Sequence, residues 1–307
     1  MLTMKKLILF SSQGISVKLV EYFSSRTDIE VMFITQVTKK DTLYDYSSPI
    51  EYCQNNNIKF YCITKFDANF TNKVRQFKPD ILLTAYYPRI LPEELLKIPK
   101  IGSFNVHPGS LPEYRGPYSI PNSILNGEIK IKATLHELTA HIDAGDIIAQ
   151  SSINIDNKMT AHELYLKGML KCADLVKSSF DDLLTGKFSK AAQVGYGSYY
   201  NYFERSFHIN WQTPVVSLMR RVRVHSYPYL PAYFFINNYC VYVKSIKVND
   251  YAHTSAQKPG RIIEIQGAKT ICVSCADAIV EILEYDIYPS LDEKKFDLVF
   301  YPGAILD

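Results

Sequence analysis

The densest group of polar side chains in the sequence lies between residues 103 and 116. Asn105 and His107 stand two apart on a predicted strand, so their side chains leave the same face of it. They lie at the carboxyl end of that strand, where open α/β sheets bind ligands. An amide beside an imidazole is suited to donating N–H groups to a carbonyl oxygen that becomes an oxyanion. The same spacing also fits a strand end with a hydrogen-bonded histidine and a Pro-Gly turn.

A second polar group lies between residues 133 and 146, where a predicted loop carries Asp143 and Asp146. A carboxylate near a histidine fixes the tautomer of the imidazole and raises its pKa, and it can itself accept a proton. Asp and Gly are also common in ordinary turns, which leaves a purely structural interpretation open. The pattern predicts that His136 faces outward or packs, and it gives His141 no partner.

The elements that must carry these residues alternate between short apolar runs and helical patterns, which is typical of βαβ units and a parallel sheet. Thr160 and Glu163 form a capping box and predict a helix that runs to about Leu184 and ends at Gly186. The turn after the first strand has no G-x-G-x-x-G pattern, and a phosphate loop is absent, which disfavours redox and ATP chemistry. The predicted strands of this part are 6–10, 30–34, 58–63, 80–85, 102–107, 133–138 and 146–153.

The pattern changes in the last third of the chain. Residues 189–210 are irregular and rich in Gly and Tyr, which predicts a linker, and a helix is expected over 214–224. Apolar and polar residues then alternate with a period of two, which predicts strands at 233–236, 240–248, 261–265, 270–274 and 278–283. A tight turn is predicted at Asn237-Asn238. We therefore predict an α/β, Rossmann-like catalytic domain with a mostly parallel sheet over residues 1–206. A smaller β-rich, OB-like domain is expected over 207–307.

Composition narrows the class of protein further. The 307 residues carry a net charge of +3, which is too weak by itself to indicate nucleic-acid or membrane binding. No apolar run approaches the roughly 18 residues of a membrane span. Six scattered cysteines are typical of reduced cytosolic thiols, and the pair Cys272 and Cys275 lacks the further ligands of a zinc site. We therefore expect a cytoplasmic protein without a metal.

Together the two polar groups resemble the formyltetrahydrofolate-dependent formyltransferases. The family motif is Asn-x-His, then Ser-Leu-Leu-Pro and often Arg-Gly, with a Thr-rich strand and an Asp-x-Gly-Asp loop farther along. This sequence has a single Leu where many members have two, and the resemblance continues through residues 209–211 and 220–223 to cover nearly the whole chain. The motifs stand here as Asn105, His107, Ser110-Leu-Pro112, Arg115-Gly116, Thr134-Leu-His136 and Asp143-Ala-Gly145-Asp146.

The resemblance implies transfer of a formyl group from 10-formyltetrahydrofolate to a primary amine, with no metal. Asn105 and His107 would hold the oxyanion, while Asp143 would orient His107 and help remove the amine proton, directly or through water. The folate side would be formed by Tyr86, Tyr87, Arg89, Ile90, Leu91 and Asp146.

The second domain and the Tyr-Arg-Gly after the Ser-Leu-Pro point, by resemblance, to either a methionyl-tRNA or an amino-sugar nucleotide acceptor. A tRNA-binding domain should be basic, yet residues 207–307 hold ten basic and ten acidic residues. We therefore predict a nucleoside-diphosphate-linked amino sugar, a precursor of a cell-surface glycan such as lipopolysaccharide. Arginine matches pyrophosphate oxygens well, although the basic face of the 214–224 helix could equally be solvated. Predicted substrate contacts are Ser110, Tyr114, Arg115, Arg220 and Arg223, with Arg223 the first choice.

Two alternatives stay open. One is a methionyl-tRNA formyltransferase, for which binding that falls steeply with salt would be expected. The other is a non-catalytic or hydrolytic folate-binding relative, against which the presence of Asn105, His107 and Asp143 together argues. Nucleic acid and membrane partners are not expected. Because sugar-formylating relatives are often dimers and the β-rich end could pair through a strand edge, a homodimer is possible.

Overall fold

The structure, a computed structural model, describes residues 4–36, 48–226, 229–249, 257–267 and 269–307. The chain divides into two compact units. The first unit comprises Met1–Ile120, Ile129–Ile155 and Leu164–Tyr202, and the second comprises Pro121–Glu128, Asp156–Glu163 and Phe203–Asp307. Among the described residues, no helix has both the length and the apolar character that crossing a membrane requires.

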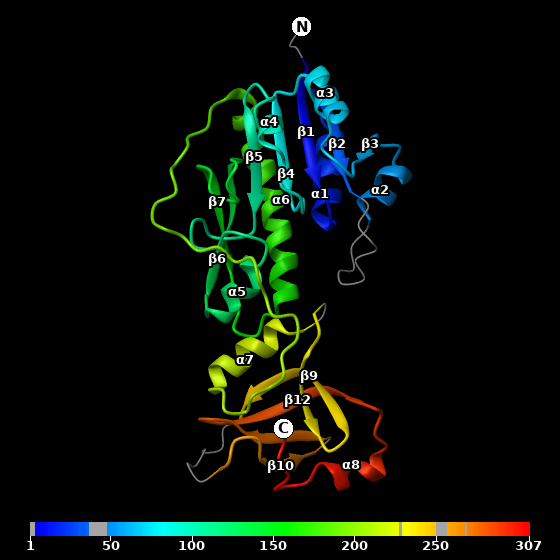
Figure 1. Ribbon diagram of the computed structural model, residues 1–307, viewed down its shortest axis with the longest axis vertical. Coiled ribbons are helices and arrows are strands. Elements are labelled where there is room, and N and C mark those ends of the chain that lie inside the picture. The colour runs from blue at the N-terminus through cyan, green and yellow to red at the C-terminus, as the bar shows by residue number, and fades with distance from the viewer. Residues whose placement is uncertain (1–3, 37–47, 227–228, 250–256, 268) are drawn as a thin grey trace. The chain divides into compact units, whose positions relative to one another are not determined.

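The first unit is built on a seven-stranded sheet with the order β3-β2-β1-β4-β5-β6-β7 (Figure 1). The first five strands in chain order pair in parallel, β6 then pairs antiparallel with β5, and β7 pairs antiparallel with β6. Between β3 and β4 the chain crosses to the other side of β1, which creates the topological switch point where such sheets bind ligands. The strands are β1 (Lys5–Ser11), β2 (Ile29–Thr35), β3 (Phe60–Cys62), β4 (Ile81–Ala85), β5 (Gly102–His107), β6 (Lys130–Glu137) and β7 (Ile147–Asn154).

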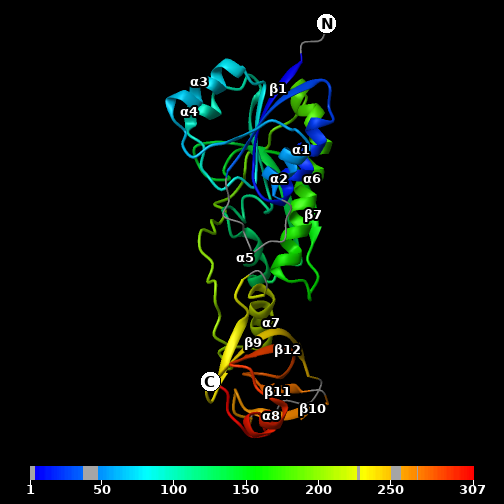
Figure 2. The same ribbon diagram turned by 90° about the vertical axis from the view of Figure 1, so that its right-hand side faces the viewer.

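Helices cover both faces of this sheet, and for that reason β4 is buried along its whole length. Figure 2 shows α3 and α4 on one side of the sheet and α1 and α6 on the other. On the α3 side, Phe10 of β1 meets the edge of Phe70 at 6.2 Å between ring centroids, and on the α1 side Phe23 meets Phe180 of α6 at 4.6 Å. The helices in this part of the chain are α1 (Gly14–Ser24), α2 (Pro49–Asn55), α3 (Ala68–Phe77), α4 (Glu93–Leu96), α5 (Ser119–Leu125) and α6 (Ala161–Thr185), and most of α5 belongs to the second unit.

The predicted capping box at the start of α6 is confirmed. The backbone N–H of Thr160 donates to Glu163 Oε2 at 2.7 Å, and the N–H of Glu163 donates to Thr160 Oγ1 at 3.2 Å. The helix ends at Thr185, and Gly186 then takes the left-handed conformation with φ +69°. Both ends of this long helix therefore lie where the sequence predicts them.

The second unit is an antiparallel sheet with the order β10-β11-β12-β9-β8. Its core includes Trp211, Phe234 and Phe300. Helix α8 was not predicted; it is short, capped by Asp292, and buries Phe296. The elements are α7 (Val215–Val224), β8 (Ala232–Ile236), β9 (Tyr239–Val248), β10 (Ile262–Gln266), β11 (Thr270–Ser274), β12 (Ile279–Tyr288) and α8 (Glu293–Val299). The predicted fold class, a mostly parallel α/β sheet with a smaller β-rich part, is confirmed.

Gly186 offers a test of the helix end that does not touch the core. A Cβ at this position would meet no atom within 4 Å, so a substitution changes only the backbone preference. We expect Gly186→Ala to lower the free energy of unfolding by about 1 kcal/mol. Gly186→Asn should cost less, because Asn adopts the left-handed region more readily. Urea unfolding followed by circular dichroism measures both, and an Ala variant as stable as the wild type would contradict this assignment.

Candidate active site

Three neighbouring strands of the first unit place a row of polar side chains side by side. Thr84 of β4 lies opposite Asn105 of β5, which lies opposite His136 of β6, and directly opposed residues point to the same face of a sheet. Thr84 Oγ1 donates to Asn105 Oδ1 at 2.6 Å, and Asn105 Nδ2 lies 3.0 Å from His136 Nε2. Because the hydroxyl fixes the amide oxygen, the NH₂ of Asn105 faces the other side chains of the cluster as a donor.

His136 is a member of this cluster that sequence reasoning missed. Its side chain is fully buried, so the prediction that it faces outward or simply packs does not describe its place in the polar row. Its Nδ1 lies 2.7 Å from the backbone oxygen of Glu137. A carbonyl only accepts, so Nδ1 carries a proton, and in the neutral ring Nε2 is left to accept from Asn105. The antiparallel register of β5 and β6 brings His136 here.

His107 lies at the end of β5 with 6% of its surface exposed. Its Nε2 lies 2.7 Å from the backbone oxygen of Tyr114, to which it must donate, and its Nδ1 lies 3.5 Å from Asp143 Oδ2. The chain passes very close to the ring at Gly109, where a Cβ would come within 3.0 Å of His107 Nε2 and of the Tyr114 oxygen. Glycine at 109 therefore allows the turn to hold the imidazole in this orientation.

Asp143 lies in the loop between β6 and β7, and its carboxylate is the centre of the cluster. Oδ2 accepts the backbone N–H of Gly116 at 2.8 Å, and Oδ1 lies 3.4 Å from Asn105 Nδ2 and 3.5 Å from His136 Nε2. Burial acts to raise the pKa of Asp143, but the positive charge of a protonated His107 imidazole and the Gly116 N–H outweigh it and hold that pKa well below its usual range.

An ionised Asp143 favours some chemical roles over others. A carboxylate with a strongly lowered pKa has little driving force to accept a proton at neutral pH. It is better suited to orienting His107 and to stabilising a positive charge on that ring. Direct acceptance of a proton by Asp143 is therefore disfavoured.

All residues predicted on the folate side except Asp146 follow β4, at the carboxyl ends of the parallel strands. Ser12, at the end of β1, donates to the backbone oxygen of Tyr86 at 2.5 Å, so this segment lies at the switch point. The ring of Tyr86 meets Tyr165 edge to face at 5.4 Å. Arg89 donates to the backbone oxygen of Thr64 at 2.6 Å.

The other residues of that prediction differ in exposure. Ile90 is 70% exposed, whereas Leu91 is buried, and Tyr87 packs against Phe10 with 5.2 Å between ring centroids. Asp146 ends the loop that holds Asp143, and its backbone oxygen accepts the N–H of Glu137 at 2.9 Å. Leu91 and Tyr87 thus take part in the core, while Ile90 is available at the surface.

The residues predicted to contact the acceptor substrate fall into two groups. In the first unit, Ser110 accepts the N–H of Tyr114 through its backbone oxygen at 2.7 Å, and the Tyr114 side chain is buried. Arg115 is half-buried and donates through Nε and Nη2 to Gln193 Oε1 at 3.0 and 2.7 Å. Gln193 lies in the segment predicted to be a linker, and no motif or spacing singles it out.

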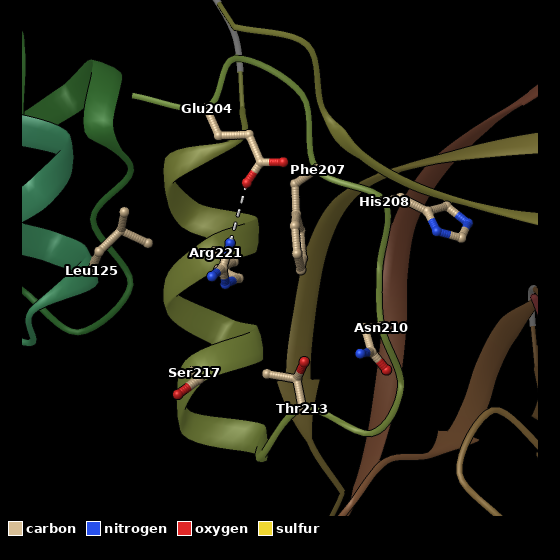
Figure 3. Close-up of a pocket in the computed structure, with 8 residues that line it drawn as sticks. All are labelled: Leu125, Glu204, Phe207, His208, Asn210, Thr213, Ser217 and Arg221. Carbon is tan, nitrogen blue, oxygen red and sulfur yellow. Dashed lines mark ion pairs between the residues drawn. The ribbon is translucent and has the colours of Figure 1, made fainter. Parts of the chain in front are cut away.

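The second group lies on α7 in the second unit. Arg223 donates to the backbone oxygens of Met159 and Asp156 at 2.8 and 2.9 Å, and Arg220 reaches that of Leu125 at 3.5 Å. Arg221 lies over the ring of Phe207 and pairs with Glu204 at 3.6 Å, along a pocket of about 490 Å³ within the second unit (Figure 3). All three arginines thus have partners in their own unit, and a substrate role for Arg220 and Arg223 stays a prediction.

A metal site in the described part of the chain would need several His, Cys, Asp or Glu side chains close together. There, no group of three or more His, Cys, Asp or Glu side chains is placed to hold a metal ion. Cys272 and Cys275 are both buried in the second unit, and Cys275 Sγ lies 3.2 Å from the backbone oxygen of Ala278.

The lowered pKa of Asp143 predicts a pH-dependent contribution to stability. A carboxyl whose folded pKa is depressed stabilises the fold above its unfolded pKa, about 4, and this contribution is lost as pH falls through the folded pKa. We expect Asp143→Asn to lower the free energy of unfolding at pH 7 by about 1–3 kcal/mol. The difference from the wild type should shrink below about pH 4. Urea unfolding at pH 7 and below about pH 4 measures this difference in the free energy of unfolding. A difference between variant and wild type that grows on acidification would contradict the argument.

Several known proteins are similar to this chain in sequence. The bifunctional polymyxin resistance protein ArnA of Wigglesworthia glossinidia brevipalpis is 29% identical over 257 residues, which are 83% of this chain but only 36% of ArnA. The methionyl-tRNA formyltransferase of Borrelia duttonii is 28% identical over 241 residues, covering 77% of this chain and 76% of that protein.

Solved structures share the fold. WlaRD, a sugar 3N-formyl transferase crystallised with dTDP and 5-N-formyl-THF, superposes with a TM-score of 0.69 at 19% identity, over 94% of this chain and 99% of WlaRD. The N-formyltransferase of Helicobacter canadensis, in complex with folinic acid and dTDP-3-aminofucose, superposes with a TM-score of 0.70 at 23% identity. The superposition covers 92% of this chain and 100% of that protein.

Family models match both parts of the chain. Residues 4–171 match the formyl transferase family, and residues 204–288 match its C-terminal domain. The first match alone spans more than half of the sequence and includes every member of the polar cluster around Asp143. The chain therefore belongs to the formyl transferase family.

Proposed function

We propose that this protein is an N-formyltransferase that moves a formyl group from 10-formyltetrahydrofolate to the primary amine of a nucleoside-diphosphate-linked amino sugar. The observation that carries the proposal is the cluster of Asn105, His107 and Asp143 in a chain of the formyl transferase family. A sugar nucleotide is supported by the two solved relatives that hold dTDP or a dTDP-sugar. It is supported further by the neutral charge of residues 207–307.

The residues fit the chemistry of formyl transfer. As the amine nitrogen bonds to the formyl carbon, negative charge develops on the formyl oxygen. Asn105 Nδ2 and a protonated His107 Nδ1 would donate to that oxygen, and Asp143 would stabilise the charge on His107. Breaking the bond between the formyl carbon and the folate nitrogen then releases the product, and the proton lost by the amine passes to that nitrogen.

The formyl donor would be held at the carboxyl end of β4. There the segment 86–91 combines the rings of Tyr86 and Tyr87 with the exposed side chain of Ile90. Aromatic and aliphatic side chains with a few polar groups suit a flat ring system such as a pterin. Folate-type ligands in the solved relatives are consistent with this donor.

A methionyl-tRNA acceptor is the second candidate, because several sequence relatives carry that name. The two candidates differ in the charge that the acceptor demands. A tRNA substrate would be held by lysines and arginines that neutralise phosphates, whereas residues 207–307 are balanced in charge. The sugar nucleotide remains the better match for this chain.

The test is formyl transfer from 10-formyltetrahydrofolate to a panel of nucleoside-diphosphate amino sugars, with charged initiator methionyl-tRNA assayed in parallel. We expect a sugar nucleotide to gain the mass of one formyl group. Transfer to the tRNA alone would overturn the acceptor and support the second candidate. Folate release without transfer to either acceptor would indicate a hydrolytic enzyme.

The same assay tests the roles of the three central residues. We expect Asn105→Ala, His107→Ala and Asp143→Ala each to lower turnover by about a hundredfold or more, because each removes a group that acts on the developing charge. His141→Ala is the matched control, since His141 is exposed in the same loop as Asp143 and should leave turnover within a few-fold. Three alanine variants that keep near wild-type rates would rule out this mechanism.

A further inference from the structure

The segment 188–200, called the strap here, follows α6 and was predicted to be part of a linker. The N–H and carbonyl of Ala191 exchange hydrogen bonds with Ile147 of β7, at 2.9 and 2.8 Å. Farther along, Arg115 donates its N–H to Ser198 at 3.1 Å and accepts that of Tyr200 at 2.9 Å. The strap, seen as part of the yellow-green coil in Figure 1, therefore joins the start of β7 to the loop that follows β5.

In the middle of the strap, the side chain of Gln193 turns inward. Residues 191–199 are exposed except for Gln193, and Val194 beside it is 85% exposed. Gln193 Nε2 donates to the backbone oxygens of Asp143 and Gly145, both at 2.8 Å. Its Oε1 accepts from the guanidinium of Arg115. The Gln193 amide thus uses all its hydrogen-bonding groups: its two hydrogens bind the Asp143 loop, and its oxygen binds Arg115.

The loop that Gln193 holds has a backbone that needs support. Asp143 has φ +50°, in the left-handed region that residues other than glycine adopt at a cost. Such a conformation persists when surrounding contacts fix it. Gln193 binds the carbonyl of this residue and that of Gly145, two positions farther along the same turn.

The far end of the strap, at Tyr200, supports the second central residue, His107. Tyr200 stacks on Tyr114 with 5.3 Å between ring centroids and 16° between planes. The backbone oxygen of Tyr114 accepts the hydrogen bond of His107 Nε2. The strap therefore contacts the supports of both His107 and Asp143.

We infer that Gln193 is a positioning residue for formyl transfer: its amide holds the Asp143 loop in its left-handed turn and couples that loop to Arg115. The inference rests on the proposed function, because it assigns Gln193 to the reaction that Asp143 serves. It makes the strap a structural part of the active site, although the strap carries none of the three central residues.

The experiment compares Gln193→Ala, Gln193→Glu and the exposed strap control Val194→Ala in the full chain. Gln193→Glu keeps the size of the side chain and an oxygen for Arg115, but it loses the N–H groups that hold Asp143 and Gly145. We expect both Gln193 variants to lower kcat by about tenfold or more. We expect Val194→Ala to keep the wild-type rate, and melting temperatures to stay close to that of the wild type.

Hydrogen exchange measured by mass spectrometry gives a readout that does not depend on the substrate. Peptides that cover residues 139–147 should exchange faster in both Gln193 variants and at the wild-type rate in Val194→Ala. Unchanged exchange in this region, or wild-type kcat in Gln193→Glu, would overturn the inference. If the wild-type protein itself transfers no formyl group, the proposed function fails, and the exchange result alone decides whether Gln193 holds the loop.

Discussion

The carboxylate of Asp143 is the group on which the rest of the site depends. Its side chain is only 11% exposed, and a buried charge is tolerated only when hydrogen-bond donors and opposite charge replace water. Those partners are the Gly116 N–H, the Asn105 amide and the His107 imidazole, which come from β5 and the loop after it, while β6 contributes His136, which accepts from Asn105. Folding of the site and ionisation of Asp143 are therefore coupled.

The change from parallel to antiparallel pairing within the sheet makes this arrangement possible. A purely parallel sheet would bring strand ends together at one edge, as it does for β1 and β4. Because β6 pairs antiparallel with β5, Thr134 lies opposite His107 at the end of β5, and His136, near the end of β6, lies opposite Asn105. His136 thereby reaches Asn105, and the loop that leaves β6 brings Asp143 back over the same strand end.

The residues of the site differ in how far the sequence could reveal them. Asn105 and His107 stood out because a period of two on one strand fixes their common face, and the fold class followed from the alternation of strands and helices. His136 could not be placed, because strand register depends on contacts far apart in the chain and a shift of one residue reverses every side chain. Gln193 gave even less signal, because its amide donates to backbone carbonyls, which every residue possesses, and its contact with Arg115 spans 78 positions of the chain. Helix α8 was missed because its apolar face is too short for a clear period.

The chemical type of residue 193 fits its double contact. A carboxylate there would bind Arg115 more strongly, but it would neutralise the guanidinium and set a negative charge against the carbonyls of Asp143 and Gly145. An amide carries no net charge, so it fixes Arg115 without cancelling its positive charge, and it supplies the two donors that the carbonyls need. If the acceptor is a nucleoside-diphosphate sugar, a cation that is held in place yet not neutralised suits a pyrophosphate. The same side chain thus fixes the geometry of the Asp143 loop and preserves the charge of Arg115.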